Sequence, residues 1–151
     1  MNYPNGSNKK YSSTTSYANR GMSLEDDLNI TNEYYNTTGI AVVHKKPTAI
    51  TIYKVDYLSN KDAVIKEARF KIPSTTDYNG IYKSKYIDFE AKETSSSTSF
   101  PLQNIHKHQL DHLRSIVKQG GIGFLIVRFT ELNETYYLGS EELFKFLKNY
   151  F

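Results

Sequence analysis

The strongest constraint on this chain is the alternating pattern of residues 86–92, Tyr-Ile-Asp-Phe-Glu-Ala-Lys. Because successive side chains of a β-strand point to opposite faces, the pattern predicts a strand with one apolar and one polar face. The apolar face would carry Ile87, Phe89 and Ala91, and the polar face Tyr86, Asp88, Glu90 and Lys92. A face with two carboxylates and an ammonium is costly to bury unless those groups have a function.

Asp77 lies thirteen residues before Glu90, and Asn79 and Gly80 between them predict a turn, since both tolerate positive φ. A hairpin there would bring the two carboxylates together. Two hard oxygen ligands beside a lysine suit Mg²⁺, with Mn²⁺ as a substitute. Lys92 would then orient or deprotonate a water on the metal, or offset charge on a phosphate. The simpler alternative is a surface strand on which Glu90 only pairs with a lysine.

The same residues resemble a known motif. Asp77, followed by Glu90, Ala91 and Lys92, resembles the PD-(D/E)xK nuclease pattern. The surrounding sequence segments are similar to the RecU family of Holliday junction resolvases. The similar segments are residues 19–25, 39–47, 73–80, 86–94 and 99–104, within a match that runs from about residue 19 to about residue 138.

The resemblance implies a restriction-endonuclease-like α/β fold, a mixed sheet flanked by helices, with Asp77, Glu90 and Lys92 as catalytic residues. It implies that Thr75 and Gln109 join Asp77 and Glu90 as Mg²⁺ ligands. Glu25, in the first turn of a predicted helix, is a second-tier candidate by the same resemblance; the simpler interpretation is a surface acid that the helix dipole favours. The implied function is a structure-specific endonuclease that resolves Holliday junctions by paired symmetric nicks in recombination and DNA repair.

Composition indicates one domain of 151 residues, without cysteines and with a net charge of only +3. No apolar run approaches membrane-spanning length and no signal peptide is recognisable, so we expect a cytoplasmic protein. We expect residues 1–19 to form a disordered basic arm and residues 20–151 a nuclease domain. Basic residues concentrate between positions 45 and 85, which favours a polyanionic partner.

Residues 49–72 predict two basic strands, and the resemblance implies that they form a stalk entering the open centre of a four-way junction. The simpler alternative is a solvent-exposed ribbon. Phosphate contacts of this kind supply affinity without sequence information. The candidate DNA-binding residues of the arm and stalk region are Arg20, Lys45, Lys46, Lys54, Lys61, Lys66, Arg69 and Lys71.

Other segments complete the expected fold. Helices are predicted from Ser23 to Gly39 and from about Leu102, and strands at residues 40–43, 122–129 and 134–138. The strand at residues 40–43 is expected to be buried, because it is continuously apolar.

Gln109 falls within the apolar stripe of the second predicted helix and therefore needs a fixed partner. That partner is either a backbone group or a water or metal beside Asp77 and Glu90, and the resemblance favours the second. His106, His108 and His112 do not make a convincing zinc site, since His106 and His108 point apart on a helix and no other ligand is near.

A four-way junction has two-fold symmetry, so one active site per chain predicts a homodimer. The resemblance also implies contacts with the RecA recombinase and branch-migration proteins, a further C-terminal segment that this sequence does not contain, and a basic, proline-bearing stalk tip in place of residues 57–60. Two alternatives stay open: a non-catalytic junction-binding protein that modulates the recombinase, and a less selective nuclease acting on flaps or branched DNA.

Overall fold

The computed structural model describes residues 4, 6, 20–59, 62–71 and 75–150, and the predicted arm therefore lies almost entirely outside the described residues. The elements in chain order are α1 (Arg20–Thr37), β1 (Val42–Lys45), β2 (Ile50–Ser59), β3 (Asp62–Phe70), β4 (Tyr78–Tyr82), β5 (Lys85–Thr94), the 3₁₀ helix η2 (Leu102–Asn104), α2 (Lys107–Lys118), β6 (Ile122–Phe129), β7 (Glu134–Gly139) and α3 (Ser140–Tyr150). None of the helices in this described part is long and apolar enough to cross a membrane.

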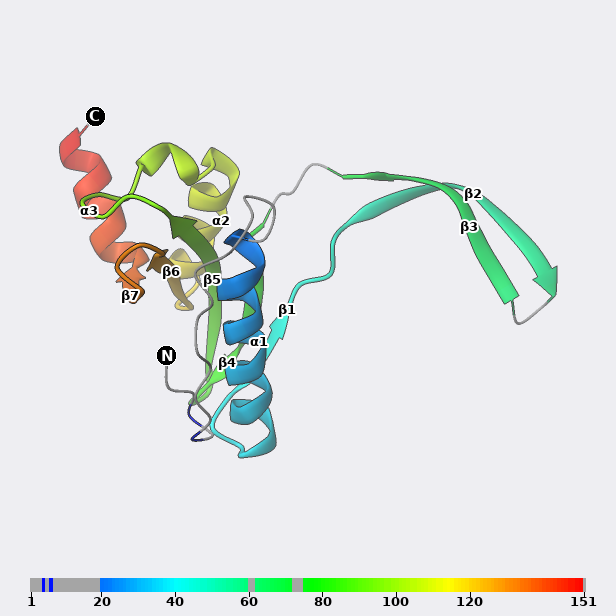
Figure 1. Ribbon diagram of the computed structural model, residues 1–151, viewed down its shortest axis with the longest axis horizontal. Helices are drawn as coiled ribbons and strands as arrows, with labels where there is room; N and C mark the ends of the chain where they lie inside the picture. Colours follow the sequence, from blue (N-terminus) through cyan, green and yellow to red (C-terminus); the bar gives the residue numbers. More distant parts are fainter. Residues whose placement is uncertain (1–3, 5, 7–19, 60–61, 72–74, 151) are drawn as a thin grey trace.

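Five strands form a mixed sheet in the order β1-β4-β5-β6-β7. β5 and β6 run parallel, and the other neighbours run antiparallel. α1 lies along one face of this sheet, while α2 and α3 lie together on the side of β6 and β7 (Figure 1). The predicted fold class, a mixed α/β sheet flanked by helices with a projecting hairpin, is confirmed.

Two apolar clusters hold the helices to the sheet, one on each face. The first joins the sheet to α2 and α3 and contains Ile105, Leu113, Leu125, Val127, Leu143 and Leu147. The second joins it to α1 and contains Ala41, Val43, Tyr78, Ile87 and Phe89. Ile87 and Phe89 thus face α1 as their alternation predicts, and the polar face of β5 turns toward α2.

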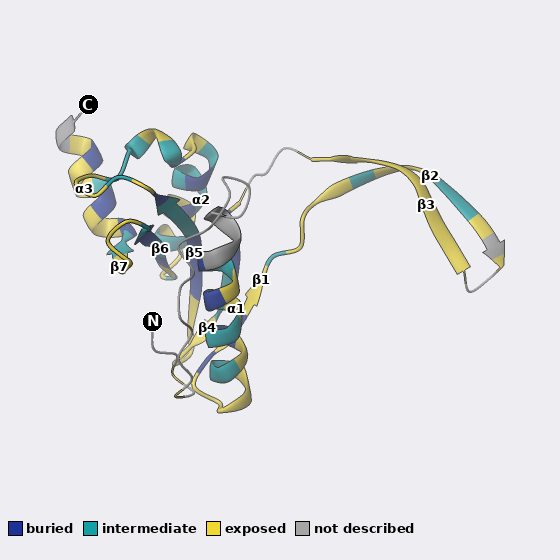
Figure 2. Ribbon diagram, in the orientation of Figure 1, coloured by how far each residue is buried: buried dark blue, intermediate teal, exposed yellow. Residues whose placement is uncertain are grey.

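β2 and β3 form a separate antiparallel hairpin that projects from the body (Figure 1). Every residue of β3 is exposed, and most of the hairpin carries the colour of exposed residues in Figure 2. The strands pair from Ile50 with Phe70 out to Ser59 with Asp62. An exposed hairpin with few side chains packed in the core agrees with the sequence pattern.

The turn predicted at Asn79 and Gly80 is wrong. Gly80 lies within β4, and a Cβ at this position would come within 2.1 Å of the Val42 carbonyl oxygen. Glycine is therefore required for the close approach of β1 to β4. The turn lies instead at Lys83 and Ser84, whose φ angles of 46° and 63° are left-handed.

Three other boundaries differ from the sequence prediction. α1 begins at Arg20 instead of Ser23. The predicted strand 40–43 is displaced to Val42–Lys45 and is an edge strand with one buried residue, so a continuously apolar run was misleading. The helix predicted from Leu102 is split into η2 and α2, and α2 starts only after His106 because the Gln109 side chain caps its first turn.

Candidate active site

Asp77 and Glu90 face each other across the β4–β5 hairpin. Tyr78 pairs with Phe89 in the antiparallel register, so Asp77, one residue earlier, lies opposite Glu90. The Ala91 backbone N–H donates to Asp77 Oδ2 at 3.4 Å. The two carboxylates predicted as a pair therefore do come together, even though the turn that joins their strands is not the predicted one.

Glu90 is almost completely buried, with 2% of its surface exposed. Its Oε1 lies 2.8 Å from Lys92 Nζ, and that lysine is itself largely buried. Burial and then the neighbouring Asp77 charge raise the Glu90 pKa to about 7, against the opposing effect of Lys92. The prediction that Asp77, Glu90 and Lys92 lie close together is therefore correct.

Gln109 connects α2 to this carboxylate. Its Nε2 donates to Glu90 Oε1 at 2.5 Å, and its Oε1 accepts from the His106 backbone N–H at 3.0 Å. The anticipated backbone partner is thus present, the second bond goes directly to Glu90, and a water or metal partner stays a prediction. The second lone pair of its amide oxygen is left for another partner.

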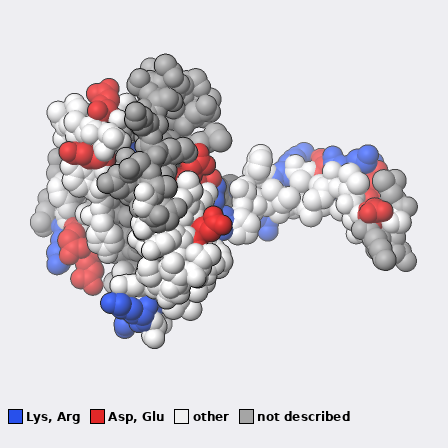
Figure 3. Space-filling model, turned by 60° about the horizontal axis from the view of Figure 1, so that its bottom comes forward, with Lys and Arg blue, Asp and Glu red and all other residues white. Residues whose placement is uncertain are grey.

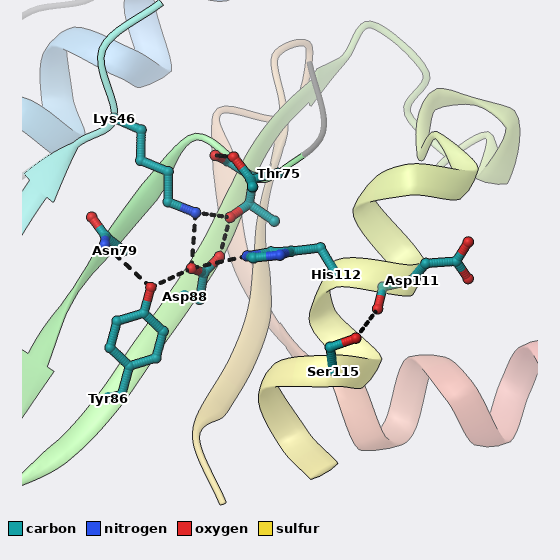
Figure 4. A network of polar contacts seen from close by, with 9 residues as sticks. Lys46, Thr75, Asn79, Tyr86, Asp88, Asp111, His112 and Ser115 are labelled. Carbon is teal, nitrogen blue, oxygen red and sulfur yellow. Dashed lines mark hydrogen bonds and ion pairs between the residues drawn. The ribbon is translucent and has the colours of Figure 1, made fainter. Parts of the chain in front are cut away.

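A second polar network surrounds Asp88, which is completely buried (Figure 4). It accepts hydrogen bonds from Lys46 Nζ at 2.8 Å, from Tyr86 OH at 2.8 Å and from Thr76 Oγ1. His112 of α2 reaches it as well, with Nε2 at 3.2 Å from Oδ2. Burial alone would raise the Asp88 pKa, but these four partners outweigh it and lower the pKa, so Asp88 is held as a carboxylate.

Sequence analysis gave Asp88 no role. The available signal was its position two residues before Glu90 on the same strand face, together with His112 three residues after Gln109 on one helix face. That spacing places two acceptors on β5 opposite two polar side chains of α2. Another partner of Asp88, Lys46, comes from a distant segment and had no such signal.

The remaining site candidates lie in different surroundings. Thr75 is exposed just before Asp77, and its Oγ1 donates to the Thr76 carbonyl at 3.3 Å. Glu25 of α1 pairs with Lys45 at the surface, both about 40% exposed. Because α1 begins at Arg20, Glu25 lies beyond its first turn, so the helix dipole does not explain its position; Glu25 is a surface acid paired with Lys45, and a role in the site stays a prediction.

The candidate DNA-binding residues separate into two groups. Lys45 and Lys46 belong to the body and are engaged by Glu25 and Asp88. On the hairpin, Lys66 lies 3.7 Å from Asp56 and Arg69 lies 3.9 Å from Glu67, in pairs that stay exposed. Figure 3 shows Lys and Arg side chains along one side of the hairpin, and the exposed basic residues there are Lys54, Lys66, Arg69 and Lys71. Lys61 and the Arg20 side chain lie outside the described part.

The donor set near Glu90 fits a hard divalent cation. Glu90 Oε2 is buried and has no hydrogen-bond partner among the described residues, although it lies beside a second carboxylate. An unpaired buried oxygen of this kind calls for a cation or a proton. In the described ranges no cluster of three or more His, Asp or Glu side chains is placed to hold a metal.

Comparison with known proteins gives a consistent match. The family model of RecU, recombination protein U, matches residues 19–150. A Geobacillus protein named Holliday junction resolvase RecU is 61% identical over 130 residues, covering 86% of this chain and 65% of that protein. A protein of the same name from Bacillus thuringiensis is 53% identical over 156 residues, covering 97% of this chain and 77% of that protein.

Among solved structures, the Holliday junction resolvase Hjc of Archaeoglobus fulgidus matches 80% of this chain and 73% of its own, with a TM-score of 0.47 and 8% identity. A similarity this low supports no conclusion about the site.

Proposed function

The chain belongs to the RecU family of Holliday junction resolvases, which are endonucleases, and from that premise we propose that it cleaves four-way DNA junctions by Mg²⁺-dependent hydrolysis. The observation that carries the proposal is the pairing of Asp77 with a buried Glu90 whose Oε2 has no hydrogen-bond partner in the described structure. The chain spans 65% of the Geobacillus relative and 77% of the Bacillus one, so the proposal concerns what this portion does.

Asp77 and Glu90 would hold the cation, with Thr75 at its edge and Gln109 contributing the second lone pair of its amide oxygen. When bound, Mg²⁺ would supply Lewis acidity to water and phosphate and offset the charge of the two carboxylates. The same charge would lower the pKa of Glu90 and keep that side chain ionised at neutral pH.

Lys92 would stabilise negative charge on the reacting phosphate. Its ammonium lies 2.8 Å from Glu90 Oε1, in a site with limited solvent access. Because electrostatic interactions are strong where water is excluded, one ammonium placed here has a larger effect on the reaction than a surface lysine would have.

The hairpin formed by β2 and β3 would bind the junction by shape and charge. It projects from the body, has every residue of β3 exposed and carries Lys54, Lys66, Arg69 and Lys71. Contacts from these residues to phosphates would give affinity without sequence preference.

A homodimer is part of the proposal, since paired symmetric nicks need two sites. A mostly apolar cavity of about 570 Å³ between α1 and the sheet supports it. Its lining includes Ile40, Tyr82, Ile122 and Tyr137, all more than a third exposed. A second copy seated there would bury these side chains. Contacts with the RecA recombinase and with branch-migration proteins belong to the same proposal as expectations from the family resemblance. A cytoplasmic location belongs to it as an expectation from the sequence.

Side-by-side cleavage of labelled four-way junction, flap and plain duplex in Mg²⁺ tests the proposal. We expect junction to be converted to nicked duplex by two symmetric cuts, with flap and duplex cleaved much more slowly. Similar cleavage of junction and flap, with plain duplex still cleaved slowly, would instead favour the less selective branched-DNA nuclease. Binding of junction without cleavage in Mg²⁺ or Mn²⁺ would favour the non-catalytic, recombinase-modulating alternative.

A further inference from the structure

Lys46 is held by its backbone N–H and by its ammonium group, at the point where the chain leaves the sheet for the hairpin. Its backbone N–H donates to the Asp77 carbonyl at 2.7 Å. Its Nζ donates to Thr76 Oγ1 at 3.0 Å and to Asp88 Oδ2 at 2.8 Å. Lys46 thus contacts Asp77, Thr76 and the strand β5 that carries Glu90.

The other end of the hairpin returns to the same place. The Lys71 N–H donates to the Ala49 carbonyl at 2.9 Å, and Thr75 follows a few residues later. The segment with Thr75, Thr76 and Asp77 is therefore the returning root of the hairpin, and Lys46 lies in its outgoing root. Both roots are bonded to Asp88 of β5 through Lys46 and Thr76.

The network also extends to α2. His112 reaches Asp88, and Gln109, one turn earlier on the same helix, donates to Glu90. Asp88 is completely buried, accepts hydrogen bonds from Lys46, Thr76 and Tyr86 and has His112 Nε2 nearby, so its oxygens are occupied by protein groups. Its structural role is consequently to hold these segments together, whereas Glu90, two residues on, keeps an unpaired oxygen.

We propose that Lys46 is a positioning residue, which together with Asp88 sets the separation of Asp77 from Glu90 and fixes both roots of the hairpin to the catalytic strand. Direct phosphate binding by Lys46 is disfavoured, since its ammonium is already paired with a buried carboxylate and only 19% of its side chain is exposed. The inference rests on the proposed function, in which Asp77 and Glu90 hold Mg²⁺.

Lys46→Met tests it, because the variant removes the ammonium but keeps the backbone N–H and most of the side-chain length. Turnover at saturating junction should fall by roughly 10- to 100-fold, since a misplacement near 1 Å costs about that much. The Mg²⁺ concentration for half-maximal cleavage should rise. Independently of activity, the increase in unfolding temperature that Mg²⁺ produces in DNA-free protein should become smaller. Junction Kd measured in Ca²⁺ should stay within about twofold, given that no phosphate contact is lost.

Lys107→Met is the matched control. It removes a lysine from an exposed ion pair with Asp111 on α2, so all four measurements should remain as in the wild type. If Lys46→Met unfolds the protein because the buried Asp88 carboxylate loses its lysine cation, Lys46→Met/Asp88→Asn removes the buried negative charge as well and should give the same pattern of losses.

Two results would overturn the inference. A weaker junction Kd with a shallower salt dependence and an unchanged Mg²⁺ response would make Lys46 a phosphate contact. A lower unfolding temperature with unchanged turnover and Mg²⁺ response would make it a structural residue only. Failure of the wild type itself to cleave junction or to be stabilised by Mg²⁺ would instead reject the proposed function.

Discussion

Gln109 Nε2 lies 2.5 Å from Glu90 Oε1, and the amide oxygen of the same glutamine accepts from the backbone N–H of His106. The two bonds fix the amide orientation, because a flipped amide would place its NH₂ group against the His106 N–H. One side chain therefore caps the first turn of α2 and holds a buried carboxylate of β5.

Replacing this glutamine should separate the two roles. Gln109→Leu removes the cap, at a cost of roughly 1 kcal/mol in the free energy of unfolding. It also removes a donor to ionised Glu90, so the pKa of Glu90 should rise and the acid limb of the pH–rate profile should move to higher pH. Activity should fall by more than the stability loss explains. Gln103→Leu, at an exposed position of η2, is the control. A stable Gln109→Leu variant with the wild-type pH profile would make Gln109 an ordinary capping residue.

The raised pKa of Glu90 predicts how stability depends on pH in metal-free protein. Its ordinary value is 4.5 and its folded value is about 7, so its favourable contribution is full below about pH 4.5 and is lost as pH rises through 7. Glu90→Gln cannot ionise, and it should exceed the wild type at pH 8 by about 1–3 kcal/mol in the free energy of unfolding. The difference should vanish near pH 4.5.

Urea unfolding in EDTA across pH 4.5–8 measures this difference, with the exposed Glu131→Gln as control. Adding Mg²⁺ at pH 8 should stabilise the wild type more than Glu90→Gln, so the difference in their free energies of unfolding should become smaller. A pH-independent difference between Glu90→Gln and wild type would show that Glu90 does not carry a raised pKa.

Arg128 provides a test of the fold away from the site. It is 1% exposed, lies 2.8 Å from Asp27 of α1, and donates from Nε to Thr135 Oγ1 at 3.1 Å. Arg128→Met leaves a buried carboxylate without its cation and should destabilise the protein by about 3–5 kcal/mol. Arg114→Met, at an exposed position of α2, should change stability by less than about 0.5 kcal/mol. Similar urea midpoints for both variants would contradict the structural role of Arg128.

The hairpin should select substrate by shape. Ile52 and Ala68 face each other in the β2–β3 register, so residues 53–67 can be replaced by Asn-Gly without altering the roots. Junction affinity should fall far more than duplex affinity, and the salt dependence of junction binding should become shallower. A full-length hairpin with Lys54→Gln, Lys66→Gln and Arg69→Gln separates charge from shape. Equal losses for junction and duplex with the shortened hairpin would indicate a general phosphate-binding surface.

Much of the site could be predicted from local periodicity. The alternation in β5 placed Ile87 and Phe89 toward the core and Glu90 and Lys92 on the opposite face, because strand geometry requires it. Pattern also located the exposed ribbon of β2 and β3. The helix positions of Gln109 and His112 were equally readable, although only the first was given a role.

What sequence could not provide depends on contacts between distant segments. Gly80 was assigned to a turn, since nothing local indicates that the Val42 carbonyl passes within 2.1 Å of a Cβ there. The pairing of Lys46 with Asp88 could not be predicted either, because the two residues are 42 positions apart in the chain. The sequence shows at which positions lysines occur, whereas burial in the folded protein determines which of them are available to DNA.

The central claim, that Asp77 and Glu90 form the metal-dependent centre of a junction nuclease, is tested most directly by Asp77→Asn and Glu90→Gln. Cleavage of labelled four-way junction in Mg²⁺ and junction Kd in Ca²⁺ should be measured on the same folded preparations. The account predicts that both variants lose cleavage by at least about a thousandfold while junction Kd changes by no more than about threefold, since the carboxylates stabilise the transition state and do not contact DNA in the complex. Retention of Mg²⁺-dependent cleavage by either variant, or a parallel loss of binding and cleavage, would contradict it.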